Sequence, residues 1–377
     1  MLLSDEQRMV RDMARDFAAE RLAPNAAERD RTGEVPREAL AEMGRLGLMA
    51  MTVPEEWGGG GADFLSYALA VEEIAAGDGG VSTNMSVNNL VAGALLGYGT
   101  EAQKERFLKD LARGERMGAF CLSEPQAGSD AAGIRTRARR SGNRYVINGT
   151  KQFITAGAVA ELALVFAVTD PAAGKRGISA FLIPTASPGY RIARVEKKLG
   201  QRASDTCQIL FDEVEATPDL LLGEEGQGYA IALANLESGR IAIAAQSVGM
   251  ARAAYEAALQ YAKTRETFGK PIIEHQAVAF RLADMATRIE AARALVHHAA
   301  SLKDAGRPCL KEASMAKLFA SEMAEGVCSD AIQVHGGYGY LADFPVERIY
   351  RDVRVCQIYE GTSDVQRLVI SRAIAAE

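Results

Sequence analysis

The sequence predicts an α+β protein of three parts: an N-terminal helical domain over residues 1–117, a β domain over 118–225 and a C-terminal helical bundle over 226–377. Apolar residues recur with a helical period through most of the first part. Between about 117 and 225, short runs of β-forming residues alternate with turn residues, and no helical pattern intervenes. After Gly226 the helical period returns. The length of 377 residues agrees with two or three domains at roughly 150 residues each.

The first part begins with a capped helix. Ser4 and Gln7 form a capping-box pattern, in which each side chain satisfies a backbone N–H of the first turn. Apolar residues then recur every four positions, at Met9, Met13 and Phe17. A second helix is expected after Pro36, and helical periodicity covers 63–113. The four consecutive glycines 58–61 predict a loop between these segments, because glycine is costly inside a helix.

The middle part reads as consecutive strands. Asn148-Gly149 separates two β-forming runs, 145–147 and 152–155, and an Asn-Gly pair in that setting predicts a β-hairpin. Further strands are expected at 162–168, 178–183, 191–195 and 207–214. Because no helices intervene, an antiparallel meander, Greek-key sheet or small barrel is favoured over a parallel sheet.

The third part carries an apolar seam typical of long antiparallel helices. Its residues follow a four-three spacing, at Val278, Leu282, Met285, Ile289, Ala292, Val296 and Ala299. Gly269-Lys270-Pro271 predicts a break between two of these helices.

Composition excludes several classes of function. Hydrophobic residues make up 48% and charged residues 24%, and the net charge of −6 gives no footprint for nucleic acid. The five cysteines include no C-x-x-C pair and the four histidines have no partner at ligand spacing, so neither a disulfide framework nor a metal site is indicated. Asp5 and Glu6 argue against a signal peptide, and no run of about 18 apolar residues predicts a membrane span. A cytoplasmic protein is expected.

Three glycine-containing stretches are candidates for chemistry, and none is a P-loop or a dinucleotide fingerprint. Residues 120–130 place hydroxyls and backbone donors on a turn, where they suit a flat heterocycle; a self-stabilised polar turn is the alternative. The glycines in 333–340 permit close approach of either a ligand or a helix. In 359–364, Glu360 follows Tyr359 and is either a base in an apolar pocket or a solvated carboxylate before a helix capped by Thr362 or Ser363.

Four motifs in this order resemble the acyl-CoA dehydrogenase family across essentially the whole chain. They are CLSEPQAGSDAAG at 121–133, RETFGKPIIEHQ at 265–276, QVHGGYGYLADFPVERIYRD at 333–352 and IYEGTSDVQ at 358–366. LESGRIAIAAQ at 236–246 and MSVNNLVAGALLGYG at 85–99 are similar to short-chain, butyryl-type members. The resemblance implies an N-terminal helical domain, a middle β domain and a C-terminal four-helix bundle.

The resemblance also implies a reaction. Glu360 corresponds to the base that removes the α proton of an acyl-CoA while the β hydrogen leaves as hydride to the flavin of FAD, giving the trans-2-enoyl-CoA. The Glu360 backbone N–H and a flavin ribityl hydroxyl would meet the thioester oxygen. Some branches carry the base immediately before the arginine matched by Arg240; here that residue is Gly239, which supports Glu360.

The remaining roles are carried over position by position. Phe153, often Trp in the family, keeps a flat packing surface but lacks an indole donor. Residues implied to bind FAD within the same subunit are Phe120, Leu122, Ser123, Phe153, Thr155, Thr362 and Asp364, and those implied to reach it from a neighbouring subunit are Arg265, Thr267, Phe268, Gln276, Gln333, Gly336 and Gly337. Residues implied to contact the substrate are Ser129, Glu237, Arg240 and Gly361.

Related activities on the same fold remain as alternatives. An acyl-CoA oxidase shares the base and flavin but is usually longer than 377 residues, and a branched-chain dehydrogenase differs in its acyl pocket. A flavin monooxygenase is expected to lack the glutamate. A DNA-binding or flavin-free structural relative is the alternative from another class. For a dehydrogenase, the resemblance implies a homotetramer built as a dimer of dimers and an electron-transferring flavoprotein as acceptor.

Overall fold

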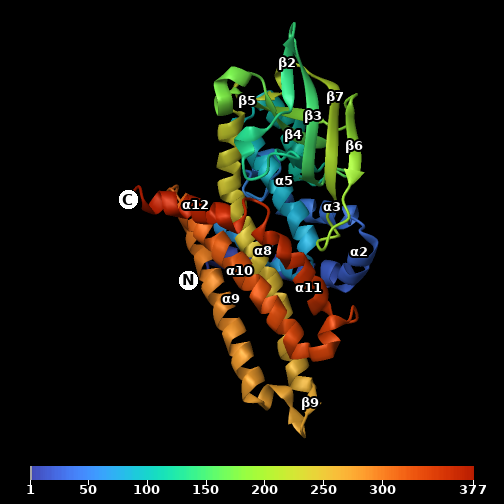
Figure 1. Cartoon of the computed structure of the whole chain (residues 1–377), viewed down its shortest axis with the longest axis vertical. Coiled ribbons are helices and arrows are strands. Elements are labelled where there is room, and N and C mark those ends of the chain that lie inside the picture. The colour runs from blue at the N-terminus through green and yellow to red at the C-terminus, as the bar shows by residue number, and fades with distance from the viewer. Residues whose placement is uncertain (1) are drawn as a thin grey trace.

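The computed structural model describes residues 2–377, which form three parts in the predicted order (Figure 1). The N-terminal part is helical, the middle part is a mainly antiparallel sheet, and the C-terminal part consists of long helices packed side by side. The sheet lies at one end of the elongated molecule and the short β9–β10 hairpin at the other (Figure 1). The predicted α+β fold class is confirmed.

The N-terminal helices begin as the sequence predicts. Ser4 caps the first helix, and the capping box with Gln7 is present. The helical segment predicted over 63–113 is divided into four α-helices: Asp78 and Thr100 each cap a new one, and a π-helical stretch, Lys104–Leu108, separates the last two. The bounds are α1 (Asp5–Phe17), α2 (Ala26–Thr32), α3 (Arg37–Arg45), α4 (Phe64–Gly77), α5 (Gly79–Tyr98), α6 (Glu101–Gln103) and α7 (Lys109–Ala112).

The sheet places its strands in the order β6-β7-β3-β2-β4-β5-β8, and β1 pairs with β4 in parallel. Every residue of β4 is buried, so this strand forms the centre of the β domain. The bounds are β1 (Gly118–Cys121), β2 (Arg137–Ser141), β3 (Arg144–Thr155), β4 (Leu162–Val168), β5 (Ile178–Pro184), β6 (Tyr190–Val195), β7 (Thr206–Ala216) and β8 (Leu221–Leu222).

The predicted hairpin at Asn148-Gly149 is wrong, because β3 continues through both residues. The pairing of β3 with β7 shifts register beside Gly149, and a Cβ there would lie 2.5 Å from Thr136 Oγ1. The Asn148 side chain donates to Glu213 Oε1 and accepts from the Glu213 backbone N–H. The Asn-Gly pair therefore marks a β-bulge, and the chain reverses instead at Gly142, between β2 and β3.

The C-terminal helices form the expected bundle around α8. Of the predicted seam on α9, every residue except the partly buried Val278 lies in the core. The predicted break at Gly269 is a tight β-hairpin, in which Gly269 has φ +80°. The bounds are α8 (Gly228–Thr264), β9 (Glu266–Thr267), β10 (Lys270–Pro271), α9 (Gln276–Asp304), α10 (Leu310–His335), α11 (Pro345–Val353) and α12 (Ser363–Ile374).

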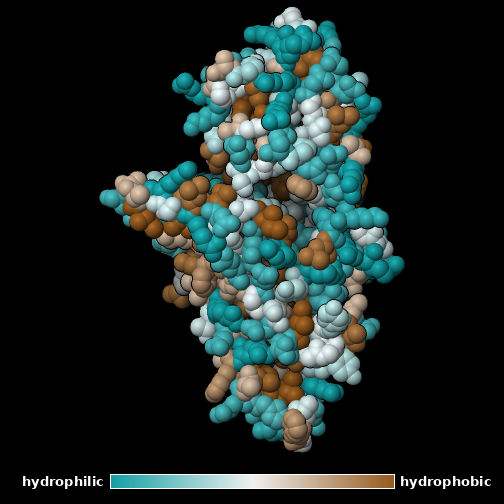
Figure 2. All heavy atoms as spheres, in the orientation of Figure 1, coloured by the Kyte–Doolittle hydropathy of each residue, from teal (hydrophilic) through white to brown (hydrophobic). Residues whose placement is uncertain are grey.

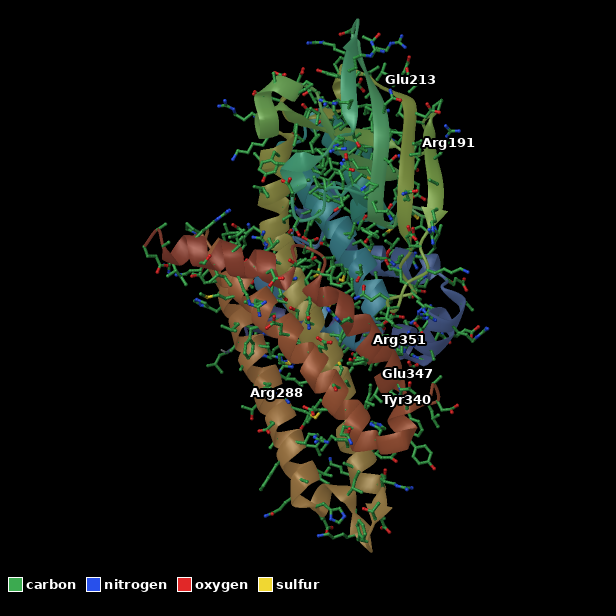
Figure 3. All side chains as sticks on the ribbon, viewed as in Figure 1. Arg191, Glu213, Arg288, Tyr340, Glu347 and Arg351 are labelled. Atoms are coloured by element: carbon green, nitrogen blue, oxygen red, sulfur yellow. The ribbon has the colours of Figure 1, made fainter. Side chains whose placement is uncertain are left out.

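Ionic contacts hold the three parts together around α11. Arg351 binds Asp30 of α2 at 2.7 Å. It also donates to the Leu199 carbonyl, in the β6–β7 connection, at 3.1 Å. Glu347, one turn earlier, binds the same guanidinium at 2.8 Å, and Figure 3 shows the two side chains together on α11. Within residues 2–377, no helix combines the length and apolarity needed to cross a membrane.

Candidate active site

A cleft of about 390 Å³ lies between the sheet, α5, α8 and the start of α12. Its wall on the sheet side comes from the loop after β1 and the end of β3, and its floor includes the segment between α11 and α12. The cleft thus brings together residues more than 200 positions apart. The predicted site residues that line it are Phe120, Leu122, Ser123, Ser129, Phe153, Thr155, Arg240, Glu360 and Gly361.

Glu360 is the carboxylate of this cleft. Its backbone is left-handed at φ +55°, and its buried Oε2 has no hydrogen-bond partner within residues 2–377. Burial raises the pKa of Glu360 to about 7, although the positive charges of Arg240 and Lys317 oppose this shift. The alternative of a solvated loop carboxylate is therefore wrong. A carboxyl group with this pKa exchanges protons readily at neutral pH, as a general base must.

Glycine at position 239 makes room for this carboxylate. Gly239 lies on α8, and a Cβ built on it would stand 2.6 Å from Glu360 Oε2 and 3.2 Å from the Leu90 side chain. Any larger residue would displace one of these groups. The departure noted in the sequence is therefore a packing requirement of the site.

Side chains of α10 and α12 hold the turn that carries Glu360. Lys317 on α10 donates to the Gly361 carbonyl at 2.7 Å. Gln366 on α12 donates to the carbonyls of Glu360 and Gly361 at 3.1 and 2.9 Å. Thr362 accepts from the Val365 backbone N–H and caps α12, so the predicted cap and the buried carboxylate coexist.

The loop after β1 is anchored by a buried ion pair. Lys151 on β3 binds Glu124 at 2.8 Å and also donates to the Leu122 carbonyl at 3.0 Å. Glu124 accepts from the backbone N–H groups of Arg135 and Thr136 at 2.6 and 2.9 Å. Burial alone would raise the pKa of Glu124, but Lys151 and these hydrogen bonds lower it to about 2. Leu122 and Ser123 are thereby held rigidly at the cleft.

An exposed aromatic side chain forms one wall of the cleft. Phe153 is 68% exposed although it lies within β3, two residues before its end, and its φ of +58° is strained for a bulky residue. Phe120 packs its ring on Phe166, with centroids 4.9 Å apart. The hydroxyl-bearing residues Ser123 and Thr155 line the same wall. A flat ring with polar edges suits such a surface.

A second group of predicted residues lies at the opposite end of α8, beside the β9–β10 hairpin (Figure 1). Arg265, Thr267, Gly336 and Gly337 line a hollow of about 440 Å³ there. At the hairpin tip Phe268 is 97% exposed with φ +52°. Gln276 and Gln333 are exposed on the neighbouring helices α9 and α10. Because α8 has 37 residues and spans about 55 Å, this group and the cleft of one chain are far apart.

Three predicted residues lie off the cleft wall. Glu237, one turn before Arg240, binds Lys303 at 3.0 Å. Thr362 serves as the helix cap, and Asp364 is exposed beside Arg367 at 3.5 Å. Within residues 2–377, no three histidine, cysteine or carboxylate side chains gather in a way that could hold a metal ion.

The sequence did not predict several residues of the site. Lys317 and Gln366 fix the Glu360 turn, and Tyr229 and Leu236 of α8 line the cleft. One signal for Lys317 was available, because it interrupts a stripe of small residues on α10, at Ala313, Ala316, Ala320 and Ala324. A lone lysine within a buried stripe needs a polar partner.

The chain matches three family models in succession. They are the N-terminal domain of acyl-CoA dehydrogenase over residues 4–115, the middle domain over 119–214 and the C-terminal domain over 226–375. An acyl-CoA dehydrogenase of Bacillus subtilis is 48% identical over 99% of this chain and 98% of its own length.

Solved structures agree with these matches. Butyryl-CoA dehydrogenase from Megasphaera elsdenii superposes with a TM-score of 0.97 and 43% identity, covering 100% of this chain and 99% of its own. A chain from a study of the electron-transferring flavoprotein of Acidaminococcus fermentans, on flavin-based electron bifurcation, superposes at 0.98 with 46% identity over 100% of both chains. The recognition drawn from the motifs is thus confirmed, and this chain belongs to the acyl-CoA dehydrogenase family of flavoproteins, oxidoreductases that act on CH–CH groups.

Proposed function

We propose that this chain binds FAD and converts a short- to medium-chain acyl-CoA to the trans-2-enoyl-CoA, with Glu360 as the base. The observation that carries this proposal is the buried, unpartnered Oε2 of Glu360 at the cleft, together with its pKa of about 7. Glu360 lines the cleft, and a buried carboxylate oxygen is rarely left unsatisfied without a functional reason. Family membership supplies the chemistry that such a base serves.

The chain's own residues account for the proton-transfer half of the reaction. Glu360 takes the α proton, and the electrons of that C–H bond pass into the thioester carbonyl as the enolate forms. The Glu360 backbone N–H donates to no other protein group within residues 2–377, so it is free to meet the enolate oxygen. Arg240, buried with an unpartnered Nε, adds a positive charge to the same cleft wall. When bound, FAD accepts the β hydrogen with its electron pair.

The residues of the cleft fit a flavin. Phe153 offers a flat exposed ring held in a strained conformation, and Phe120 and Leu122 continue this apolar wall. Ser123 and Thr155 add hydroxyl groups that can bond the polar edge of the isoalloxazine. We assign these five residues to the flavin ring end of FAD.

The residues near the β9–β10 hairpin belong to the same proposal through a neighbouring subunit. Arg265, Thr267, Gly336 and Gly337 form a hollow too far along α8 to reach the cleft of their own chain. A homotetramer in which Phe268 and this hollow approach the partner's FAD would bury that 97% exposed ring. Figure 2 shows further apolar side chains on the projecting α12, where Leu368 and Ile374 are about half exposed. Sedimentation of wild type and Phe268→Ser tests this assembly, and loss of assembly together with flavin is expected for the variant.

A small recess beside Gly239 favours a short acyl chain in the substrate. The recess has a volume of about 120 Å³, against about 390 Å³ for the main cleft. Phe64, Tyr67 and Leu90 contribute bulky side chains to its wall, and Ser86 lines both the recess and the main cleft. The butyryl-CoA dehydrogenase among the similar structures supports the same assignment. An anaerobic titration with butyryl-, octanoyl- and isovaleryl-CoA tests chain length and branching together.

The electron acceptor is proposed to be an electron-transferring flavoprotein, in line with the subject of the study that supplied one similar structure. An acyl-CoA oxidase is the alternative, and the two differ in how the reduced enzyme meets oxygen. Slow reoxidation in air after reduction by substrate supports the dehydrogenase; fast reoxidation with hydrogen peroxide supports the oxidase. All five cysteines are buried and unpaired, which suits the proposed cytoplasmic location.

Glu360→Gln tests the base directly. The amide keeps the size of the side chain, so the variant should still bind FAD and acyl-CoA. Bleaching of the flavin by butyryl-CoA should fall by at least about 10³-fold, because glutamine cannot accept the α proton. Bleaching within tenfold of wild type would place the base elsewhere.

A further inference from the structure

Lys317 is a fully buried lysine whose position is not explained by the core. It lies on α10 with 0% of its surface exposed, among alanines and serines of the packed helix face. Its ammonium group makes no ion pair within residues 2–377, and it donates a hydrogen bond to the Gly361 carbonyl at 2.7 Å. A buried lysine without a carboxylate in contact is unfavourable for stability, so its retention calls for another reason.

The turn that Lys317 holds is one that would not persist alone. Glu360 and Gly361 are both left-handed, at φ +55° and +88°. For glutamate this conformation is strained, and surrounding contacts must maintain it. Lys317 and Gln366 bind the carbonyl oxygens of this turn from the side of the bundle. These contacts fix the direction in which the Glu360 side chain leaves the backbone.

Lys317 also contributes charge to the base. Burial raises the pKa of Glu360, while Arg240 on α8 and Lys317 on α10 act in the opposite direction. Burial, together with the charge of Glu360, raises the pKa of Tyr67 on α4. Arg240 lines the cleft and meets whatever binds there, whereas Lys317 lies beneath the turn, off the cleft wall. Its charge therefore acts on Glu360 whether or not a ligand is bound.

Lys317 itself is charged at neutral pH. Burial lowers its pKa to about 8; Glu360 opposes this shift and Arg240 adds to it, while the nearby Cys356, whose own pKa burial raises, stays a neutral thiol. Glu322, on the same helix, also opposes the lowering. Below about pH 8 the ammonium form is thus present across the range in which Glu360 titrates.

We propose that Lys317 is a positioning residue of the reaction, which holds the Glu360–Gly361 turn through the Gly361 carbonyl and favours the ionised form of the Glu360 carboxylate through a buried positive charge. This inference rests on the proposed role of Glu360 as the base. Lys317 lies off the cleft wall, so in this proposal it acts through Glu360 alone.

The test compares Lys317→Met with wild type as purified holoenzyme. Flavin reduction by saturating butyryl-CoA is followed anaerobically by stopped flow from about pH 6 to pH 9. The rate rises with pH as Glu360 ionises. Without the positive charge, the midpoint of this rise should move up by about 1 pH unit, and the plateau rate should fall about 10- to 100-fold because the turn is less well held. The dissociation constant of butyryl-CoA should change less than about threefold.

Two further variants separate charge from packing. Lys311→Met, on the same helix but partly exposed beside Glu377, should match wild type in midpoint and plateau. Lys317→Arg keeps the charge, so its midpoint should stay at the wild-type value even if its bulk lowers the plateau. Lys317→Gln gives the same comparison as Lys317→Met if the methionine variant does not fold, because it also lacks the charge.

The outcomes distinguish this inference from the function on which it rests. Wild-type flavin that no acyl-CoA reduces would overturn both. A second outcome would overturn the role of Lys317 alone. In it, acyl-CoA reduces the wild-type flavin and Glu360→Gln abolishes this reduction, but Lys317→Met leaves the midpoint and plateau of the pH profile unchanged. Equal midpoint shifts in Lys317→Met and Lys317→Arg would also overturn it, because the shift would then not follow the charge.

Discussion

Replacing Gly239 by alanine tests how tightly α8 sets the position of Glu360, the proposed base. The added Cβ would stand 2.6 Å from Glu360 Oε2 and 2.9 Å from its carboxyl carbon. A Cβ essentially never comes closer than 3.0 Å to another atom, and ordinary contact begins at 3.4 Å, so the carboxylate must move by about 0.4–0.8 Å. Misplacing a reacting group by about 1 Å costs about 100-fold in rate. We therefore expect flavin reduction by butyryl-CoA to slow by about 10- to 50-fold.

The assay is the anaerobic half-reaction at saturating acyl-CoA, with flavin content and unfolding temperature measured on the same samples. Gly97→Ala is the matched control, because Gly97 lies on the helix α5 with no atom within 4 Å of its added Cβ. That control should keep the wild-type rate and gain up to about 1 kcal/mol in stability. A Gly239→Ala enzyme that reduces its flavin within twofold of wild type would refute the reasoning.

Three other predictions concern stability. Because burial raises the pKa of Glu360 to about 7, the folded state favours the protonated carboxyl group. The stability that this protonation contributes is present below pH 4.5 and is lost as the pH rises through 7. Calorimetry should therefore find Glu360→Gln more stable than wild type at about pH 8 and similar to it near pH 4.5. Lys151→Met should cost about 3–5 kcal/mol in urea unfolding, since it leaves Glu124 buried without its cation, and Lys151→Met with Glu124→Gln should recover part of this loss. Arg351→Met should cost about 1–3 kcal/mol by removing the contact to Asp30, with the rate of flavin reduction unchanged.

The kinds of element were predictable wherever local sequence decides them. The seam on α9 has a helical period that only one face can satisfy, and the Ser4 capping box needs only the first turn. The error at Asn148-Gly149 has a tertiary cause. The backbone of Thr136 passes so close to Gly149 that no side chain fits, and Glu213 of β7 binds Asn148 across the sheet. The same dipeptide that makes a turn in isolation here makes a bulge inside a paired strand.

The site was predictable only where a motif marked it. The loop after β1 and the segment around Glu360 each carry a recognisable pattern, and the structure places both on one cleft. Lys317 carries no such pattern, and its partner Gly361 lies 44 positions away on another element. Only the packing of α10 against that turn shows that the lysine amine and the Gly361 carbonyl meet. Sequence can mark Lys317 as an anomaly in a small-residue stripe, but it cannot say what the amine binds.

The features that lower stability gather around one side chain. Glu360 has a left-handed backbone, a carboxylate oxygen without a partner and a raised pKa, and directly beneath it lies a buried lysine. Each of these alone would be removed by a substitution that stabilises the fold, such as glycine at 360 or methionine at 317. They are compatible with a folded chain because α4, α5 and α8 supply a large apolar core around them. A preorganised base requires local strain that rigid surroundings maintain. If the turn relaxed, the carboxylate could rotate toward water and would lose both its position and its raised pKa.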